Sequence, residues 1–238
     1  MKDKIIVITG ASEGLGRVAA AKLVAEGATV ALVAHNEDTL ATTAQELGSN
    51  AHPYVCDVSS PDQIQQTTQK VLADFGRIDI LINNAGIWTD ENLEKDDPSR
   101  RRKAFEVNTL GTIEFTKALE PIFRKQNSGH ILNVISTSGT NDTAAGDNKL
   151  WQSYGATKWA LAGFTRALKD SFDGTGIKVT GLYPGGFDSN LYENASRPNP
   201  HEQPWMMKTE DVADALIFCL TRQADVLVEK LVVTKFSI

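Results

Sequence analysis

The sequence lacks the features that mark membrane, secreted and metal-binding proteins. Its apolar runs are short, since Ile5–Ile8 ends at Thr9 and no later run is much longer, whereas a membrane-spanning helix needs about 20 consecutive apolar residues. The sequence shows no basic segment followed by an apolar one, which is the pattern of a secretory signal. The two cysteines, Cys56 and Cys219, lie in separate apolar segments without a CxxC pattern, so we expect buried thiols and no metal site. We therefore expect a cytoplasmic protein without membrane contacts.

An excess of positive charge is also lacking. The formal net charge is −6 at pH 7, which argues against non-specific attraction to nucleic acid. We interpret the one basic run, Arg100–Lys103, as a solvated helix face. The chain has an ordinary globular composition, with 41% hydrophobic and 23% charged residues. Its 238 residues fit one large or two small domains.

The first region with a chemical pattern is rich in glycine. The β-branched run Ile5–Ile8 predicts a buried strand, and Arg17–Glu26 has apolar residues at helical spacing. Between them lies the turn Thr9-Gly10-Ala11-Ser12-Glu13-Gly14-Leu15-Gly16. Glycines let the backbone approach a pyrophosphate, and a helix N-terminus presents free N–H groups and the positive end of its dipole. This stretch therefore indicates a dinucleotide-phosphate site.

The second predicted strand bears on the choice between NADP and NAD. Thr29–Ala34 predicts a strand that ends in His35-Asn36. At this place an acidic residue accepts hydrogen bonds from the ribose 2′-hydroxyl of NAD, whereas a cation suits the 2′-phosphate of NADP. The acidic residue is missing, which favours NADP(H). Glu13 acts in the opposite sense, because a carboxylate repels the phosphate, and NAD stays possible.

Strands and helices alternate along the rest of the chain. Apolar runs predict strands at His52–Val55, Ile78–Ile82, Ile131–Ile135 and Leu231–Val233. Helical patterns occur at Asp38–Leu47, Ser60–Phe75, Pro98–Phe123 and Thr209–Leu220. The alternation predicts an α/β fold with a parallel, doubly wound sheet that binds ligands at the carboxyl ends of its strands. We expect a single domain over residues 1–238.

Polar residues follow several of these strands. Asp57, with Val58 next to it, either accepts a hydrogen bond from an adenine amino group or caps the helix that Ser60-Pro61 begins. The tetrapeptide Asn83-Asn84-Ala85-Gly86 combines side-chain amides with small residues that leave room for a ligand. Asn108 lies in the long polar helix and is, by itself, a surface or interface residue.

A possible acid–base pair lies in Ser153-Tyr154-Gly155-Ala156-Thr157-Lys158. On a helix, Tyr154 and Lys158 lie one turn apart on the same face. An isolated tyrosine has a pKa of about 10, and a nearby ammonium favours its charged form. The pair by itself is equally a helix surface with a half-buried tyrosine and a solvated lysine.

Taken together, these motifs resemble the short-chain dehydrogenase/reductase family over nearly the whole chain. The matching residues are Thr9, Gly10, Gly14, Gly16, Asp57, Asn83-Asn84-Ala85-Gly86, Asn108, Ser136, Tyr154, Lys158 and Pro184-Gly185. Each match is weak alone, but their order and spacing are those of the family. The resemblance implies a Rossmann-type sheet of about seven parallel strands with helices on both faces.

The resemblance also implies a role for each site residue. Tyr154 would be the general acid in carbonyl reduction and the base in alcohol oxidation, with Lys158 lowering its pKa and bonding the nicotinamide ribose. Ser136 would bond the substrate oxygen, and Asn108 would hold a water that links Lys158 to solvent. The other implied cofactor contacts are Gly10, Ser12, Glu13, Gly14, Leu15 and Gly16 near the phosphates, His35, Asn36, Asp57, Val58, Asn84, Ala85 and Gly86 near the adenosine, and Pro184, Gly185 and Ser189 near the nicotinamide.

The chain departs from the family pattern after Ser136. Eighteen positions separate Ser136 from Tyr154, more than the family's usual spacing, so Thr140–Trp151 reads as a lengthened loop over the site. This leaves Ser138 as a rival for the serine role. At the other end, the chain lacks the glycine-rich tail of many relatives after its last strand.

A second departure concerns the family's substrate lid, here about residues 186–207. Gly186 after Pro184-Gly185 is expected to loosen the segment that leads into it. Apolar side chains in the lid would suit closure over an apolar ligand, and equally packing on a neighbouring subunit; they are Tyr192, Trp205, Met206 and Met207.

The leading functional hypothesis is an NADP(H)-preferring oxidoreductase that acts on a small-molecule ketone, aldehyde or secondary alcohol. Alternatives are an NAD-preferring alcohol dehydrogenase, a non-catalytic dinucleotide-binding regulator, and an enzyme of the same fold that dehydrates or epimerises. The intact Ser136, Tyr154 and Lys158 disfavour the regulator. The resemblance implies a homodimer or homotetramer that assembles through the helices bearing Asn108 and Tyr154. The residues do not identify the substrate.

Overall fold

The fold is built on parallel strands that are buried on both faces. The computed structural model describes residues 1–89, 97–140, 152–191, 201 and 203–236, and its strands form one seven-stranded parallel sheet in the order β3-β2-β1-β4-β5-β6-β7. The strands are β1 (Ile5–Thr9), β2 (Thr29–Ala34), β3 (Ala51–Val55), β4 (Ile80–Asn83), β5 (Gly129–Val134), β6 (Ile177–Pro184) and β7 (Lys230–Val233). β1 and β2 consist mainly of buried apolar residues, and all of β5 except Gly129 is buried, which is typical of strands covered on both sides. The predicted doubly wound α/β fold is confirmed.

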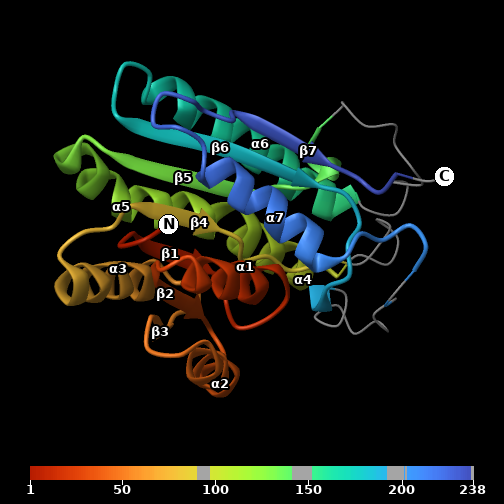
Figure 1. Ribbon diagram of the computed structural model, residues 1–238. Coiled ribbons are helices and arrows are strands. Elements are labelled where there is room, and N and C mark those ends of the chain that lie inside the picture. Colours follow the sequence, from red (N-terminus) through yellow and green to blue (C-terminus); the bar gives the residue numbers. More distant parts are fainter. Residues whose placement is uncertain (90–96, 141–151, 192–200, 202, 237–238) are drawn as a thin grey trace.

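Helices cover both faces of the sheet. One face packs against α1 (Gly14–Ala25), α2 (Glu37–Leu47) and α7 (Thr209–Leu220). The other packs against α3 (Pro61–Phe75), α5 (Thr112–Gln126) and α6 (Gln152–Ser171). In Figure 1, α1 and α7 lie side by side in front of the sheet. This arrangement leaves the carboxyl ends of the strands as the edge where loops from both layers meet.

The long helix predicted over 98–123 is present but contains a stretch that is not α-helical. It begins as α4 (Pro98–Phe105), passes through one π-helical stretch, η1 (Glu106–Gly111), and continues as α5. Pro98 occupies the first turn of α4, and the Asp97 side chain accepts a hydrogen bond from the Ser99 N–H at 2.8 Å, a favourable helix start. The short π-helical stretch is a feature that hydrophobic spacing does not reveal, and such stretches are frequent at functional sites.

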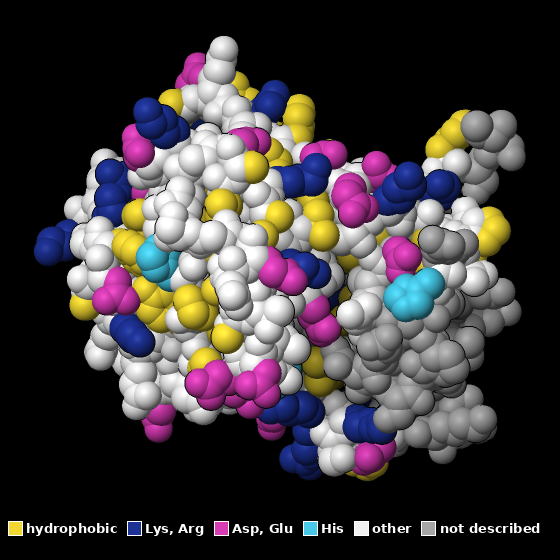
Figure 2. Space-filling model, turned by 60° about the horizontal axis from the view of Figure 1, so that its bottom comes forward, with side chains coloured by type: hydrophobic (Ala, Val, Ile, Leu, Met, Phe, Trp, Pro, Cys, Tyr) yellow, Lys and Arg dark blue, Asp and Glu magenta, His cyan; other side chains and the backbone are white. Residues whose placement is uncertain are grey.

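Charges of both signs are spread over the surface. Figure 2 shows Lys, Arg, Asp and Glu side chains interspersed on one face, with apolar side chains between them. Within the described ranges, no helix has the length and apolar character needed to cross a membrane. The same residues contain no group of three His, Cys, Asp or Glu side chains placed to hold a metal ion.

One buried histidine makes the stability of the sheet depend on pH. His130 on β5 lies beside Lys178 on β6 in the strand register, and its Nε2 is 2.8 Å from the Thr180 hydroxyl. Thr180 in turn donates to the Val228 carbonyl at 2.7 Å. Burial, helped by the charge of Lys178, lowers the pKa of His130 to about 4. The folded protein therefore keeps His130 neutral at a pH where the unfolded chain protonates it.

We predict that His130 makes the fold sensitive to acid. Because its folded pKa lies below the unfolded value of 6.5, the protein loses stability as the pH falls from about 6.5 towards 4, by roughly 2 kcal/mol at pH 5. Urea unfolding at pH 7 and pH 5 should show a larger loss for the wild type than for His130→Gln, whatever the variant costs at pH 7. Equal losses in the two proteins would contradict this account.

Candidate active site

A cavity of about 400 Å³ lies at the carboxyl ends of the strands. It is lined by loops and helix ends from both layers of the fold, as expected for a doubly wound sheet. Most residues predicted for cofactor binding or catalysis line it, namely Gly10, Ser12, Glu13, Gly14, Leu15, His35, Asp57, Val58, Asn84, Ala85, Gly86, Ser136, Tyr154, Lys158, Pro184, Gly185 and Ser189. The sequence motifs therefore converge on one place.

Three predicted site residues do not line this cavity. Gly16 is buried in α1, where an added Cβ would lie 2.1 Å from the Gly10 carbonyl oxygen. Asn36 caps α2, because its Oδ1 accepts a hydrogen bond from the Thr39 N–H at 3.1 Å. Asn108 is fully buried behind the cavity wall. Each holds the local structure in place rather than facing the open space.

The glycine-rich turn is pressed against the end of β4. Gly10 has φ of +65°, and a Cβ there would lie 2.9 Å from the Ala85 Cα, so only glycine fits. The Asn84 side-chain amide donates to the carbonyls of Thr9 and Gly10 at 3.0 and 3.1 Å. The Thr9 hydroxyl oxygen accepts from the N–H groups of Asn84 and Ala85 at 3.0 and 3.1 Å. Two motifs that are far apart in sequence are thus bonded together and form the floor of the cavity.

The start of α1 has the properties of a phosphate site. Its N-cap residue, Glu13, makes no side-chain capping bond, and the first turn contains no acidic residue. Ser12, Gly14 and Leu15 line the cavity at this point, where the first N–H groups of a helix have no intrahelical acceptors. The residues present therefore fit a dinucleotide pyrophosphate.

Asp57 lies in the turn between β3 and α3. Its Oδ1 accepts from the Ser59 N–H at 2.9 Å and the Ser59 hydroxyl at 2.7 Å. Ser60 caps α3, accepting from the Gln63 N–H at 3.4 Å, so capping is not the role of Asp57. Partial burial raises the pKa of Asp57, but hydrogen bonds from Ser59 and Lys103 outweigh it and hold the pKa below its usual value. Asp57 is therefore an anion on the cavity wall.

Tyr154 and Lys158 lie one turn apart on α6, as predicted. Both are buried, and the Lys158 Nζ is 5.6 Å from the centre of the Tyr154 ring. The Lys158 ammonium donates to the Val134 carbonyl at 3.1 Å. Burial lowers the pKa of Lys158 from 10.5 to about 8. The lysine is thus not a solvated surface residue, and it is still mainly a cation at neutral pH.

Asn108 joins the π-helical stretch to the catalytic helix. Its Oδ1 accepts from the Ile87 N–H at 2.8 Å, and its Nδ2 donates to the Ile87 carbonyl at 2.9 Å and to the Thr157 hydroxyl at 3.2 Å. The Thr157 hydroxyl donates to the Tyr154 carbonyl at 2.7 Å. A Cβ on Gly86 would lie 3.4 Å from Asn108 Oδ1 and 3.8 Å from Lys158 Nζ. These residues therefore form one connected group beside the cavity.

The two candidate serines differ in position. Ser136 lines the cavity, whereas Ser138 is buried and is not among the lining residues. The Ser136 Oγ accepts from the Ser138 N–H at 3.1 Å, at the start of the short 3₁₀ turn η2 (Thr137–Gly139). In the described ranges the Ser138 hydroxyl has no hydrogen-bond partner. Thr140–Trp151, predicted as a long loop, lies outside the described residues except for Thr140.

The base of the predicted lid has a defined structure. The Gly186 carbonyl accepts from the Met207 N–H at 3.0 Å, and the Asp188 N–H donates to the Met207 carbonyl at 3.0 Å. A Cβ on Gly186 would lie 2.3 Å from the Trp205 ring, so this glycine makes room for an indole. Gly186 therefore admits a close contact, where we expected it to loosen the chain. Residues 192–200 and 202 of the predicted lid lie outside the described residues.

Several cavity residues were not predicted as site residues. They include Ile87, Trp88, Lys103, Val107, Asn190 and Leu191. The Trp88 ring packs against Tyr154 with centroids 4.5 Å apart, and Trp88 directly follows the Asn-Asn-Ala-Gly-Ile stretch. Lys103 and Val107 are four residues apart, which places them on one helical face, but the sequence does not show that this face meets the cavity. The Arg100–Lys103 run is predicted to be a solvated helix face; the Lys103 side chain is 46% exposed and also lines the cavity.

Comparisons with known proteins agree with this geometry. A family model described as short chain dehydrogenase matches residues 4–200. An uncharacterised oxidoreductase of Staphylococcus epidermidis is 34% identical in an alignment 238 residues long. The alignment covers 98% of this chain and 97% of that protein.

Solved structures of dehydrogenases and reductases are also similar to this chain. An alcohol dehydrogenase from the archaeon Thermococcus sibiricus, complexed with 5-hydroxy-NADP, is similar with a TM-score of 0.87 and 28% identity over 98% of this chain and 97% of that one. A 3-ketoacyl-(acyl-carrier-protein) reductase from Brucella melitensis, complexed with NADH, is similar with a TM-score of 0.86 and 27% identity over 98% and 97%. With its seven-stranded parallel sheet and a family match over most of its length, the chain belongs to the short-chain dehydrogenase/reductase family of oxidoreductases.

Proposed function

We propose that the protein transfers hydride between NADP(H) and a ketone, aldehyde or secondary alcohol, with Tyr154 as the acid–base residue. The observation that carries this proposal is the position of Tyr154, on the cavity wall and one helical turn from a buried ammonium. An isolated tyrosine titrates near pH 10, and the Lys158 cation favours its charged form. Proton transfer to and from a substrate oxygen then becomes effective closer to neutral pH.

In this proposal the chain binds and orients the reactants, while the nicotinamide supplies the hydride when bound. The glycine-rich turn and the α1 N-terminus hold the pyrophosphate, and Pro184, Gly185 and Ser189 line the nicotinamide end. Ser136 accepts a hydrogen bond from the Ser138 N–H, which leaves its own hydroxyl hydrogen to donate to the substrate oxygen. This supports Ser136 rather than Ser138 in the serine role.

Lys158 and Asn108 have distinct tasks. The Lys158 ammonium donates once to Val134, so two of its three protons stay free for ribose hydroxyls. Both amide hydrogens of Asn108 are used by Ile87 and Thr157. We therefore assign the Asn108 side chain a positioning role, in which it ties the segment after β4, at Ile87, to the helix that carries Tyr154.

The preference for NADP(H) rests on the end of β2. Ala34 and the exposed His35 line the cavity where an acidic residue would bind the ribose of NAD. Glu13 is the one carboxylate in the glycine-rich turn, and its Oε2 accepts from the Asn190 side chain at 3.4 Å. This contact turns the Glu13 carboxylate towards the base of the lid, which supports acceptance of a 2′-phosphate.

Assembly and location stay predictions of the family resemblance. Leu110 on η1 and Trp159 on α6 are large apolar side chains that are 53% and 47% exposed. They support a homodimer or homotetramer formed through these helices, because apolar surface gains from burial in an interface. We also propose a cytoplasmic location, where NADP(H) and small carbonyl compounds meet.

We predict that Tyr154→Phe abolishes turnover and leaves nucleotide binding nearly unchanged. The variant removes one hydroxyl and keeps the ring that packs against Trp88, so catalysis should fall by about 10² or more. Steady-state rates on a panel of ketones, aldehydes and secondary alcohols, combined with NADPH titration of the same protein, check this. Substantial residual turnover by the variant would overturn the role of Tyr154.

We predict tighter binding of NADPH than of NADH, with His35 controlling the difference. His35→Arg should strengthen NADPH binding and His35→Asp should weaken it, because the two variants place opposite charges near the 2′-phosphate. Fluorescence titration of each protein with both nucleotides measures the ratio. A wild type that prefers NADH would instead favour the NAD-dependent alcohol dehydrogenase.

We predict that burial of Lys158 costs stability. Its pKa falls from 10.5 to about 8 on folding, a shift equivalent to roughly 3 kcal/mol. Below pH 8 both states are charged and the full cost is present; it fades as the pH rises from 8 to 10.5, because the unfolded chain then holds the extra proton. Lys158→Met should thus stabilise the protein at pH 7 by about 1 to 3 kcal/mol, and by less at pH 9.5.

Urea unfolding at the two pH values tests this cost. Lys117→Met is the matched control, since the Lys117 side chain is 72% exposed and its replacement should have a small effect at both pH values. A Lys158→Met protein that is less stable than the wild type at pH 7 would show that the ammonium stabilises the fold.

A further inference from the structure

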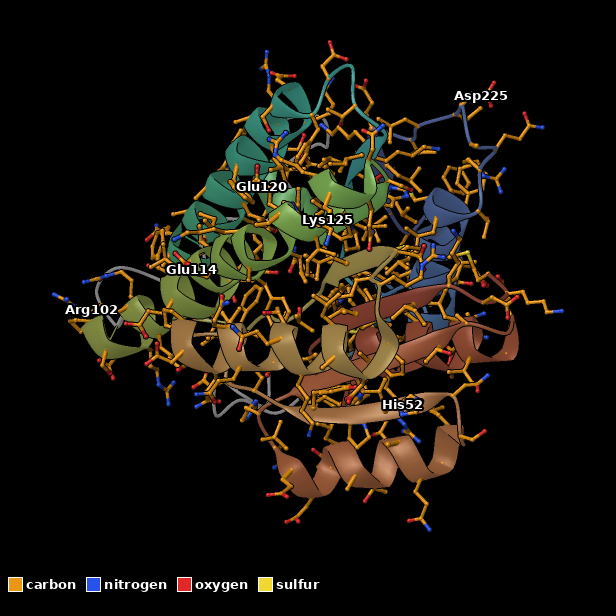
Figure 3. The ribbon with its side chains drawn as sticks, turned by 90° about the vertical axis from the view of Figure 1, so that its left-hand side faces the viewer. His52, Arg102, Glu114, Glu120, Lys125 and Asp225 are labelled. Atoms are coloured by element: carbon orange, nitrogen blue, oxygen red, sulfur yellow. The ribbon has the colours of Figure 1, made fainter. Side chains whose placement is uncertain are left out.

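One residue of the basic run turns back towards the body of the protein. The Lys103 Nζ is 3.1 Å from Asp57 Oδ2 and 2.6 Å from the Ser59 hydroxyl. Its neighbour Arg102 is exposed, and Figure 3 shows it at the outer end of α4. Lys103 therefore links α4 to the β3–α3 turn, and the run is not a uniform solvated face.

The two linked elements enclose one end of the cavity. Lys103 and Val107 are four residues apart, hence on the same helical face, and both line the cavity. Asp57 and Val58 line it from the β3–α3 turn. The elements approach closely, because a Cβ on Gly111 would lie 2.5 Å from the Val58 carbonyl oxygen. We call this end of the cavity the slot: Val58 and Val107 line it from the two elements, and the part-exposed Lys103–Asp57 ion pair lies beside them.

This slot has the chemistry of a heterocycle site. Two valines offer apolar walls to a flat ring, while a carboxylate and an ammonium can pair with polar atoms on its edge. Asp57 Oδ1 accepts two bonds from Ser59 and Oδ2 accepts one from Lys103. A carboxylate has about four acceptor sites, so Oδ2 can still accept from an exocyclic amino group.

We propose that Lys103 is a positioning residue for the adenine half of the cofactor. It fixes the Asp57 carboxylate beside the slot and holds α4 against the β3–α3 turn. The inference rests on the proposed dinucleotide binding and adds to it a residue outside the glycine-rich turn and the end of β2. The ion pair joins α4 to the turn after β3, whereas Tyr154 is on α6, so Lys103 should affect the binding of adenine-containing nucleotides and not proton transfer.

The test compares two nucleotides that differ in the adenosine half. NADPH contains it, and reduced nicotinamide mononucleotide, NMNH, does not. Lys103→Met should weaken NADPH binding about 3- to 10-fold, since a charge-assisted contact is lost, and should leave NMNH binding unchanged. Lys103→Arg should retain most of the affinity. Arg102→Met removes the same charge from the neighbouring exposed position and should have little effect.

A double-mutant cycle separates positioning from a general electrostatic or structural effect. Asp57→Asn should weaken NADPH binding, and adding Lys103→Met to it should cost much less than Lys103→Met alone, because the two residues act as a pair. Protein fluorescence measures each affinity, and thermal unfolding confirms that each variant is folded.

The outcomes distinguish this inference from the proposed function. If the wild type binds NADPH and Lys103→Met binds it equally well, or loses NADPH and NMNH affinity alike, the role of Lys103 is wrong and dinucleotide binding stands. If the wild type binds no dinucleotide, the proposed function fails and this inference fails with it.

Discussion

The close approach of the backbone at the ends of β1 and β4 is the constraint on which the site depends. β1 lies between β2 and β4, so the chain winds outwards in opposite directions from this point, where doubly wound sheets open a crevice for ligands. At Gly10 the two backbones are too close for a Cβ, and Thr9 and Asn84 bond each motif to the other. This contact fixes the α1 N-terminus relative to the Asn-Asn-Ala-Gly stretch. The other site residues are placed around that fixed floor.

Much of this arrangement follows from local sequence. Buried parallel strands read as β-branched runs, and a glycine-rich turn after the first of them indicates a phosphate site. Tyr154 and Lys158 are predictable as a pair because helical geometry brings residues four apart together. The fold and the convergence of these motifs on one cavity could therefore be expected before any coordinates were known.

Other features depend on contacts between distant segments and could not be predicted in this way. Lys103 reads as one of four consecutive cations, and only the packing of α4 against the β3–α3 turn brings it to Asp57. Gly186 reads as a flexible position, yet its neighbour in space is the Trp205 ring, 19 positions later in the chain. The sequence favours Ser136 but leaves Ser138 as a rival, and the 3₁₀ turn decides which one reaches the cavity. Local sequence patterns do not predict such contacts between distant segments.

The π-helical stretch gives one continuous helix two separate tasks. A regular α-helix has 3.6 residues per turn, so the direction of one side chain fixes the directions of all the others along the helix. The wider turn of η1 rotates the side-chain directions of α4 relative to those of α5. Lys103 upstream of η1 and Val107 within it line the cavity, while downstream Phe115, Leu119 and Phe123 are buried in the core. The side chains that contact a ligand can therefore change during evolution without altering those that hold the helix on the sheet.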